Sequence, residues 1–163
     1  MIDTVEQAIG VYESLGRGAG IVQLPSSGAF EIEGAILRAL RPAFQTGVPS
    51  DEKTVQNAIE VILRSIGVEF TREQERVPVG ARAFVPDFVV DADDLVIEAK
   101  VVTAKHSLSA VQEEITSDVA AYRTRWKRIL FVIYDCGGFI HDPERMRSEN
   151  TRQFGVSVLV VKH

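Results

Sequence analysis

The chain has 163 residues, of which 45% are hydrophobic, and it carries a formal net charge of −5. This length and composition predict one ordinary globular domain, and no apolar run approaches the roughly 18 residues that a membrane-spanning helix needs. The first residues lack a basic segment followed by an apolar one, so we expect no secretory signal, and the single cysteine, Cys136, indicates a reducing, cytoplasmic compartment.

The charge is distributed unevenly along the chain. Residues 51–100 carry eleven acidic and six basic side chains, whereas residues 101–163 carry seven acidic and nine basic ones. The net negative charge argues mildly against a nucleic-acid partner. A basic C-terminal third beside an acidic middle is nevertheless compatible with a metal-dependent nuclease, and equally with a solvated helix end that has no partner.

Residues 1–48 are predicted to form a helical extension ahead of the main domain, residues 49–163. Apolar side chains at helical spacing predict one helix over residues 3–15 and a second over residues 30–44, although Pro42 disfavours the last turn of the second helix. No residue of the extension carries recognisable chemistry. It could serve dimerisation, partner binding or a lid, or it could simply add packing.

A strong helix is predicted to begin after Ser50 or Asp51, either of which suits the N-cap position. Its apolar stripe consists of Val55, Ala58, Ile59, Ile62, Leu63 and Ile66. Glu52 falls near the middle of this stripe and Gln56 lies at its edge. Either Glu52 is simply an acid favoured by the helix dipole in the first turn, or both polar side chains face the strands that follow.

Two strands after this helix hold the most distinctive residues of the chain. Phe84–Val90 and Leu95–Val102 are apolar and β-branched, and the polar run between them predicts a hairpin. Because side chains alternate along a strand, Glu98 and Lys100 share one face, and Asp87 can reach the same face across the hairpin. A preceding polar strand over residues 68–76 would complete an antiparallel meander.

A second strong helix is predicted from Leu108 to Trp126. Its inward face is expected to consist of Leu108, Val111, Ile115, Val119, Tyr122 and Trp126. Asp118 lies in the centre of that face, where a carboxylate is unfavourable unless it is paired, hydrogen-bonded or bound to a cation. A backbone hydrogen bond or a different helix orientation would also explain Asp118, but its position and Tyr122 one turn away favour a functional role.

The C-terminal part predicts two further strands. The continuous apolar run Ile129–Tyr134 is typical of a central strand that pairs in parallel after a helical crossover, and Val156–Val161 predicts the last strand. A short helix is expected between them, beginning near Pro143. The three histidines, His106, His141 and His163, have no metal-ligand spacing.

Pro86-Asp87 and Glu98-Ala99-Lys100 together resemble the signature of the PD-(D/E)XK nucleases. The order helix, three strands, helix, strand also resembles the αβββαβ core of that superfamily, which implies an α/β fold with a mixed central sheet flanked by helices. The resemblance covers roughly residues 50–163. Within it, the helix start Asp51–Gln56, the strand ending at Lys100 and the run ILFVIYDCGGFIHDP look like the DpnII/MboI-type restriction endonuclease domain.

The resemblance implies roles for individual residues. Asp87 and Glu98, with the backbone carbonyl of Ala99, would bind Mg²⁺ or Mn²⁺, and Lys100 would position or activate the attacking water. Glu52 would support a second metal or a bridging water. Residues in supporting roles would be Gln56, which would orient water or phosphate, and Asp118 and Tyr122, which would hold Lys100 or contact the DNA backbone.

One motif departs from the family pattern, and the resemblance also implies contacts with DNA and a dimer. Asp118 and Tyr122 have the spacing of the Gln-x-x-x-Tyr motif of related nucleases, but Asp replaces Gln, which puts the role of this motif in question. The expected phosphate contacts are Arg123, Arg125, Lys127 and Arg128. An enzyme that cuts duplex DNA in restriction or phage defence would act as a homodimer.

Two other functions stay open at this stage. The domain could be a catalytically silent nuclease fold that binds DNA or protein, since one fold hosts many functions. It could also be a nuclease effector that requires a regulatory protein partner, which residues 1–48 would bind.

Overall fold

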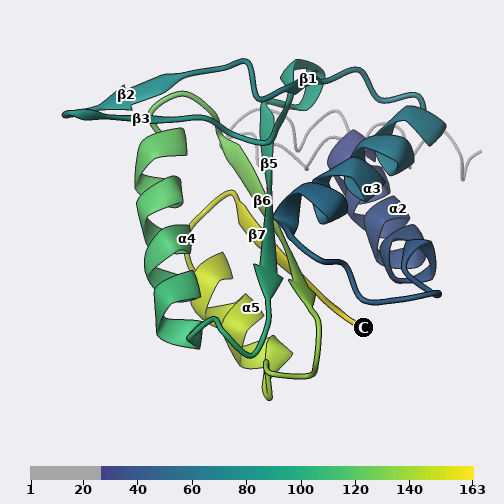
Figure 1. The fold of residues 1–163 in the computed structure, drawn as a ribbon. Helices are drawn as coiled ribbons and strands as arrows, with labels where there is room; N and C mark the ends of the chain where they lie inside the picture. The colour runs from purple at the N-terminus through teal and green to yellow at the C-terminus, as the bar shows by residue number, and fades with distance from the viewer. Residues whose placement is uncertain (1–26) are drawn as a thin grey trace, which may run out of the picture.

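The computed structural model describes residues 27–163. A central sheet is covered by α2 and α3 on one face and by α4 and α5 on the other, in the three layers visible in Figure 1. The helices are α2 (Ser27–Ala43), α3 (Glu52–Ser65), α4 (Leu108–Tyr122) and α5 (Pro143–Thr151). The strands are β1 (Thr71–Arg72), β2 (Val77–Val79), β3 (Arg82–Phe84), β4 (Phe88–Val90), β5 (Leu95–Val102), β6 (Arg128–Asp135) and β7 (Val156–Lys162).

The five-stranded sheet has the order β1-β4-β5-β6-β7. β1, β4 and β5 pair antiparallel, whereas β5, β6 and β7 pair in parallel. The α/β fold with a mixed sheet is therefore confirmed, and so is the central position of β6, whose apolar run is buried on both faces. β2 and β3 form a separate two-stranded hairpin outside this sheet.

Each face of the sheet has its own hydrophobic core, because side chains alternate along the strands. Ile97, Ala99 and Val101 of β5 point into the core beneath α2 and α3. Val96 and Val102 point into the core beneath α4 and α5. Glu98 and Lys100 lie in phase with the second set, so they share one face, as the alternation predicted, and that face is covered by α4.

The short length of β4 determines where the polar residues can lie. β4 pairs with Leu95–Ile97 only, so the second half of β5 has no neighbouring strand on that side. Side chains from both helical layers can approach this part of β5 from the open edge. The first turn of α3 lies there. Asp51 caps this helix, as predicted for its start, because its side chain accepts a 2.8 Å hydrogen bond from the Thr54 backbone N–H.

Several boundaries differ from the predictions. The strand expected over residues 68–76 is reduced to Thr71–Arg72. The strand expected over residues 84–90 is divided, because the chain leaves the β2–β3 hairpin before it enters β4.

The helices also depart from their predicted bounds. α4 ends at Tyr122 rather than at Trp126, and Leu108 is exposed at its first turn instead of facing inward. α2 continues through Pro42 to Ala43, where a proline in the last turn is tolerated. The helix predicted over residues 3–15 lies outside the described residues. No described helix is long and apolar enough to cross a membrane.

The start of β7 depends on Gly155, because the main chain just before β6 passes close to it. Gly155 has φ of +79°, and a Cβ added there would lie 2.1 Å from the Lys127 carbonyl oxygen. We expect Gly155→Ala to lower the free energy of unfolding by more than about 2 kcal/mol, because it combines backbone strain with a clash against main chain. Urea denaturation measures this. Gly47→Ala is the matched control, since a Cβ at Gly47 meets no atom within 4 Å and should change stability little.

Candidate active site

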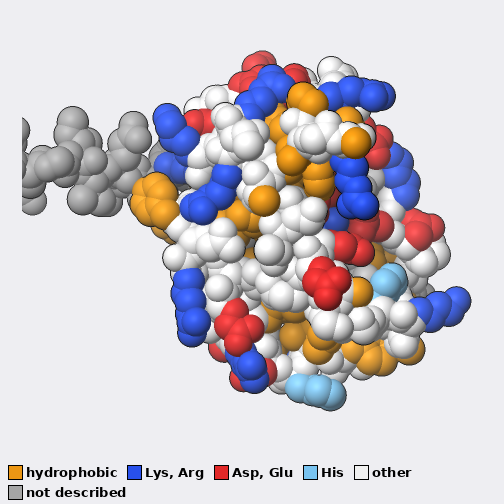
Figure 2. All heavy atoms as spheres, turned by 90° about the vertical axis from the view of Figure 1, so that its left-hand side faces the viewer, with side chains coloured by type: hydrophobic (Ala, Val, Ile, Leu, Met, Phe, Trp, Pro, Cys, Tyr) orange, Lys and Arg blue, Asp and Glu red, His pale blue; other side chains and the backbone are white. Residues whose placement is uncertain are grey.

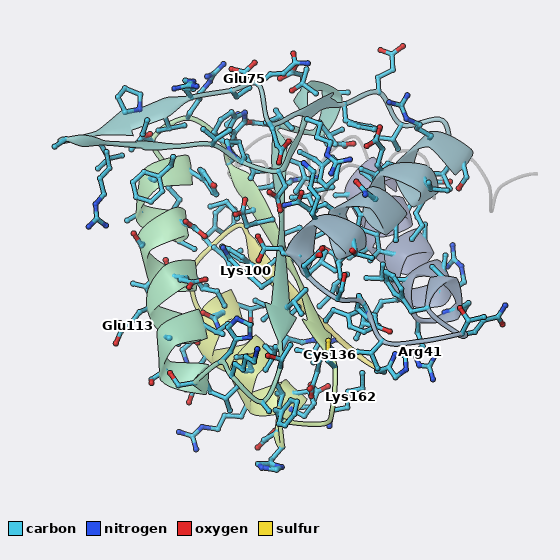
Figure 3. The ribbon with its side chains drawn as sticks, viewed as in Figure 1. Arg41, Glu75, Lys100, Glu113, Cys136 and Lys162 are labelled. Atoms are coloured by element: carbon cyan, nitrogen blue, oxygen red, sulfur yellow. The ribbon has the colours of Figure 1, made fainter. Side chains whose placement is uncertain are left out.

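The predicted signature residues come together at the open edge of β5, near the centre of the molecule, where Figure 3 labels Lys100. Asp87 precedes β4, and its carboxylate accepts a 2.8 Å hydrogen bond from the Ala99 backbone N–H. The Asp87 backbone N–H in turn donates to Glu98 Oε2 at 3.3 Å. Lys100 Nζ donates to Glu98 Oε1 at 3.3 Å. These contacts fix both carboxylates and the ammonium relative to one another.

α4 supplies the second part of the cluster, from the face that the helical spacing predicted. Asp118 Oδ2 lies 3.0 Å from Lys100 Nζ. The Tyr122 hydroxyl, one turn further along, donates to Glu98 Oε2 at 3.1 Å. The buried Asp118 carboxylate is therefore paired, because the Lys100 ammonium lies against it. The more exposed Glu114 carboxylate stands 3.7 Å from the same ammonium, and sequence reasoning did not identify it.

α3 supplies the third part from the opposite helical layer. Gln56 Nε2 donates to Asp87 Oδ1 at 2.7 Å, and its carbonyl oxygen accepts from Arg72 at 3.3 Å. Arg72 therefore fixes the orientation of the Gln56 amide, a role that nothing in the sequence around Arg72 indicates. No side-chain hydrogen bond of Glu52 is found within residues 27–163, but Glu52 is partly buried and lies near enough to Lys100 and Asp87 for their charges to affect its pKa.

Burial distinguishes this cluster from an ordinary surface arrangement of charges. Asp87 and Glu98 are each 6% exposed and Lys100 is 9% exposed. Within residues 27–163, the buried polar or charged side chains are Gln56, Asp87, Glu98, Lys100, Asp118, Asp135 and Asn150. All but the last two belong to the cluster. Buried charges are unfavourable for folding unless they are paired, so a structural role alone explains this concentration poorly.

Asp135 and Asn150 have structural explanations that the cluster lacks. The Asp135 carboxylate accepts hydrogen bonds from the backbone N–H groups of Phe139 and Ile140 and so holds the loop after β6. Asn150 exchanges hydrogen bonds with Gln112, which ties α5 to α4. These hydrogen bonds explain why both polar side chains are buried, and both residues lie outside the site.

The acidic side chains of the cluster outnumber its basic ones, and the pKa values of its carboxyl groups are raised. Burial, together with the charge of Asp87, raises the pKa of Glu98 to about 8. Burial also raises the pKa of Glu52 to about 7 and raises the pKa values of Asp87 and Asp118. Around neutral pH the ligand-free protein therefore retains protons that an added cation would displace.

The Lys100 ammonium has the opposite balance. Burial lowers its pKa, but the carboxylates of Glu98 and Asp118 outweigh burial, so the net pKa lies above that of an ordinary lysine. Lys100 is therefore positively charged at neutral pH. Such a group orients and stabilises negative charge rather than accepting a proton from water.

The donor set suits a hard divalent cation. No group of three or more His, Cys, Asp or Glu side chains arranged for a metal is found in residues 27–163, so a cation at Asp87 and Glu98 would also need main-chain oxygen. The Ala99 N–H points toward Asp87, and the carbonyl of a strand residue leaves on the same side as its N–H. Continuing the β4–β5 register places Pro86 opposite Ala99, and proline has no N–H to bind that carbonyl. Two carboxylates with raised pKa values and one carbonyl are oxygen ligands that Mg²⁺ or Mn²⁺ accepts.

A cavity of about 440 Å³ lies along the same open edge. It is lined by Glu52 and Asp51 of the α3 start, by Val101 of β5 and by residues 103–106 of the following loop. A second cavity, of about 310 Å³, lies at the other end of β5 and shares no lining residue with the first. The first cavity is lined by Glu52, whose pKa responds to the charges of Lys100 and Asp87, whereas the second is lined by none of these residues.

The four basic residues expected to contact phosphate lie after α4, away from the carboxylates. Arg123 donates to the Phe154 carbonyl oxygen, Arg125 pairs with Glu75 at 2.7 Å, and Lys127 lies 3.4 Å from Asp94. Lys127 and Arg128 also line the second cavity. The structure therefore brings Asp87, Glu98, Lys100, Gln56, Asp118 and Tyr122 together, with Glu52 alongside, but it does not bring these four basic residues to them.

Comparison with protein families matched the greater part of the chain. The family model described as DpnII-MboI, REase_DpnII-MboI, matches residues 45–163, which is well over half of the chain. Comparisons with curated proteins and with solved structures gave no significant match. The matched range begins just before α3 and contains every residue of the cluster.

Proposed function

Because the chain belongs to the DpnII-MboI restriction endonuclease family, we propose that it is a metal-dependent endonuclease that hydrolyses phosphodiester bonds of DNA. The single observation that carries the proposal is the buried cluster, in which Asp87, Glu98 and Lys100 meet at the open edge of β5. A family match supports the nuclease class, and the cluster supports the chemistry.

Asp87, Glu98 and the Ala99 carbonyl would hold Mg²⁺ or Mn²⁺. When bound there, the cation supplies a Lewis acid for the phosphoryl oxygen and lowers the pKa of water. The Asp87 carboxylate is held in place by the Ala99 N–H and by Gln56, and the Glu98 carboxylate by Tyr122 and the Asp87 N–H. These four donors, with the Lys100 ammonium on Glu98, therefore fix the two carboxylates before substrate arrives.

Lys100 is proposed to orient the attacking water and to stabilise charge on the phosphate as one phosphorus–oxygen bond forms and another breaks. Its ammonium is held by Glu98 and Asp118, so Asp118 acts here as a positioning residue. Aspartate suits this task better than glutamine, because its charge pairs with the ammonium. Glu52 would bind a bridging water or a second cation, and Gln56 would orient water or phosphate.

A restriction enzyme must cut both strands of a duplex, which favours a homodimer. Residues 1–48 are proposed to contribute to dimerisation or to bind a regulatory partner. Within this segment, α2 is already packed against the body of the domain through Ile32, Ile36 and Leu40. Its outward side chains Phe30 and Leu37 are exposed and are the part of α2 available for such contacts.

Cation binding should depend on pH in a defined direction. Because burial raises the pKa of Glu98 to about 8, a cation must displace a proton from the site below that pH. We expect the apparent Mn²⁺ affinity to rise about tenfold per pH unit up to about pH 8 and then to level off. Isothermal titration calorimetry in buffers of different ionisation enthalpy measures both the affinity and the protons released. An affinity that does not change between pH 6 and pH 8 would contradict this.

Cleavage of supercoiled plasmid DNA tests the proposed function. We expect nicked and linear products with Mg²⁺ or Mn²⁺ and none with EDTA. No cleavage together with no cation binding would exclude the enzyme and favour a silent nuclease fold. Cation binding without cleavage would favour an effector that needs a partner.

A further inference from the structure

The β2–β3 hairpin has no role in the chemistry described so far, yet it is joined directly to the site. Only Val85 and Pro86 separate the end of β3 from Asp87. The hairpin projects from the upper edge of the molecule over the C-terminal end of α4, as Figure 1 shows. We propose that this hairpin enters a groove of duplex DNA. Arg76 and Arg82 would bind backbone phosphates on either side of that groove. This inference rests on the proposed function and names the surface that holds its substrate.

The hairpin is anchored at its base. Val77 of β2 is buried in the core beneath α4. The Phe84 ring packs edge-on against the Tyr122 ring, with 6.5 Å between their centroids, and Tyr122 in turn reaches Glu98. Movement of the hairpin base is therefore resisted by the same tyrosine that orients a metal-binding carboxylate. An element fixed in this way can hold substrate in a constant position relative to the site.

Beyond its base, the hairpin is exposed and narrow. Residues 78–83 are all exposed, and Val79, with 41% of its surface accessible, is among the exposed large hydrophobic side chains. The tip is formed by Gly80 and Ala81, and a Cβ added at Gly80 would meet no atom within 4 Å. A two-stranded ribbon of this kind fits the major groove of B-DNA, which is about 12 Å wide.

The charge of the hairpin differs from that of the rest of the protein. Residues 76–86 contain Arg76 and Arg82 but no acidic residue, in a chain with a net charge of −5. No salt bridge or side-chain hydrogen bond is found for either arginine among the described residues, whereas the neighbouring Glu75 is paired with Arg125. In Figure 2, where the end of the hairpin faces the viewer, Lys and Arg side chains flank a small hydrophobic patch at the top of the molecule.

The distance between hairpin and site suits a duplex bound across both. Asp87 lies five positions after Arg82, and five extended residues span at most about 18 Å. With about 3.4 Å per base pair, Arg82 would meet the duplex within about five base pairs of the phosphate at Lys100. One duplex can therefore occupy the cluster and the hairpin together.

DNA binding by charge-matched variants tests the inference. All proteins carry Lys100→Ala, so that DNA stays intact with Mg²⁺ present, and the probe is a fluorescent 30-base-pair duplex pool of random sequence. We expect Arg76→Ala with Arg82→Ala to weaken binding about tenfold or more at low salt, and to reduce the slope of log affinity against log salt by about 0.9 per lost contact. The matched control, Arg38→Ala with Arg41→Ala, removes two charges from α2 on the opposite side, where Figure 3 labels Arg41, and should leave both quantities unchanged.

The outcomes separate this inference from the proposed function. Equal binding by the hairpin variant and the α2 control would overturn the inference. Plasmid cleavage by the unmodified protein is measured separately. If cleavage occurs while the hairpin variant binds normally, only the inference fails; if no protein binds or cleaves DNA, the proposed function fails with it. Far-UV circular dichroism verifies that each variant is folded.

Discussion

Replacing Lys100 by alanine should reduce the rate of DNA cleavage by about a thousandfold. The ammonium is the positive charge held within the carboxylate cluster, 3.0 Å from Asp118 and 3.3 Å from Glu98. Removing one preorganised group that stabilises charge in the transition state typically reduces the rate by about 10²–10³-fold. Here the same change also leaves the water without its orienting partner. Single-turnover cleavage, with enzyme in excess over DNA, measures this step without product release.

The experiment needs two controls, because Lys100 also stabilises buried carboxylates. Lys162→Ala removes an exposed lysine at the end of β7, far from the cluster, and should retain full activity. Circular dichroism and urea denaturation show whether Lys100→Ala remains folded under assay conditions. A folded Lys100→Ala protein that cleaves DNA within about threefold of the unmodified rate would refute the role given to Lys100.

Glu98→Gln should abolish cleavage and yet make the protein more stable at pH 8. The carboxylate is 6% exposed and lies beside Asp87, so its charged form is disfavoured in the folded state. Glutamine keeps the shape and removes the charge, while Lys100 retains its ion pair with Asp118. We expect a gain of roughly 1–2 kcal/mol in the free energy of unfolding without metal, since a carboxyl group whose pKa is raised by burial lowers stability when it ionises. Urea denaturation of both proteins in EDTA measures the difference.

The sign of the pH dependence follows from the raised pKa. The folded protein holds the Glu98 proton up to about pH 8, whereas an ordinary glutamate releases it near pH 4.5. Stability contributed by this proton is complete below pH 4.5 and is lost as the pH rises toward 8. The advantage of Glu98→Gln should therefore appear above pH 4.5 and grow up to about pH 8. A variant that is less stable than the unmodified protein at pH 8 would show that Glu98 is structural.

Much of the site could be predicted from the sequence because it depends on local periodicity. Alternation along β5 places Glu98 and Lys100 on one face of the strand, and helical spacing places Asp118 and Tyr122 on one face of α4. Both relations depend only on residues close in sequence, so they hold whatever the tertiary details are. The continuous apolar run of β6 likewise indicated a central parallel strand, which the structure confirms.

The remaining features depend on contacts between distant segments. Nothing in the sequence indicates that Arg72 orients the Gln56 amide or that Glu114 approaches Lys100. The late start of β4 at Phe88 could not be predicted either, because apolar and β-branched residues stand on both sides of Pro86-Asp87. The separate hairpin arises where β2 and β3 pair with each other rather than with β4. Phosphate contacts by the basic residues after α4 stay a prediction, but the partners Glu75, Asp94 and Phe154 of Arg125, Lys127 and Arg123 become visible only in three dimensions.

The most direct test of the account is a Mg²⁺ titration of plasmid cleavage by the unmodified protein beside Asp87→Asn. Asparagine is nearly the same size as aspartate and can still accept the Ala99 N–H hydrogen bond, so the fold should be retained while one carboxylate is lost. We predict that the unmodified protein shows saturable, Mg²⁺-dependent cleavage and that Asp87→Asn gives no product at any Mg²⁺ concentration. Cleavage in EDTA, or equal cleavage by a folded Asp87→Asn protein, would contradict the claim that these buried carboxylates bind the cation on which the reaction depends.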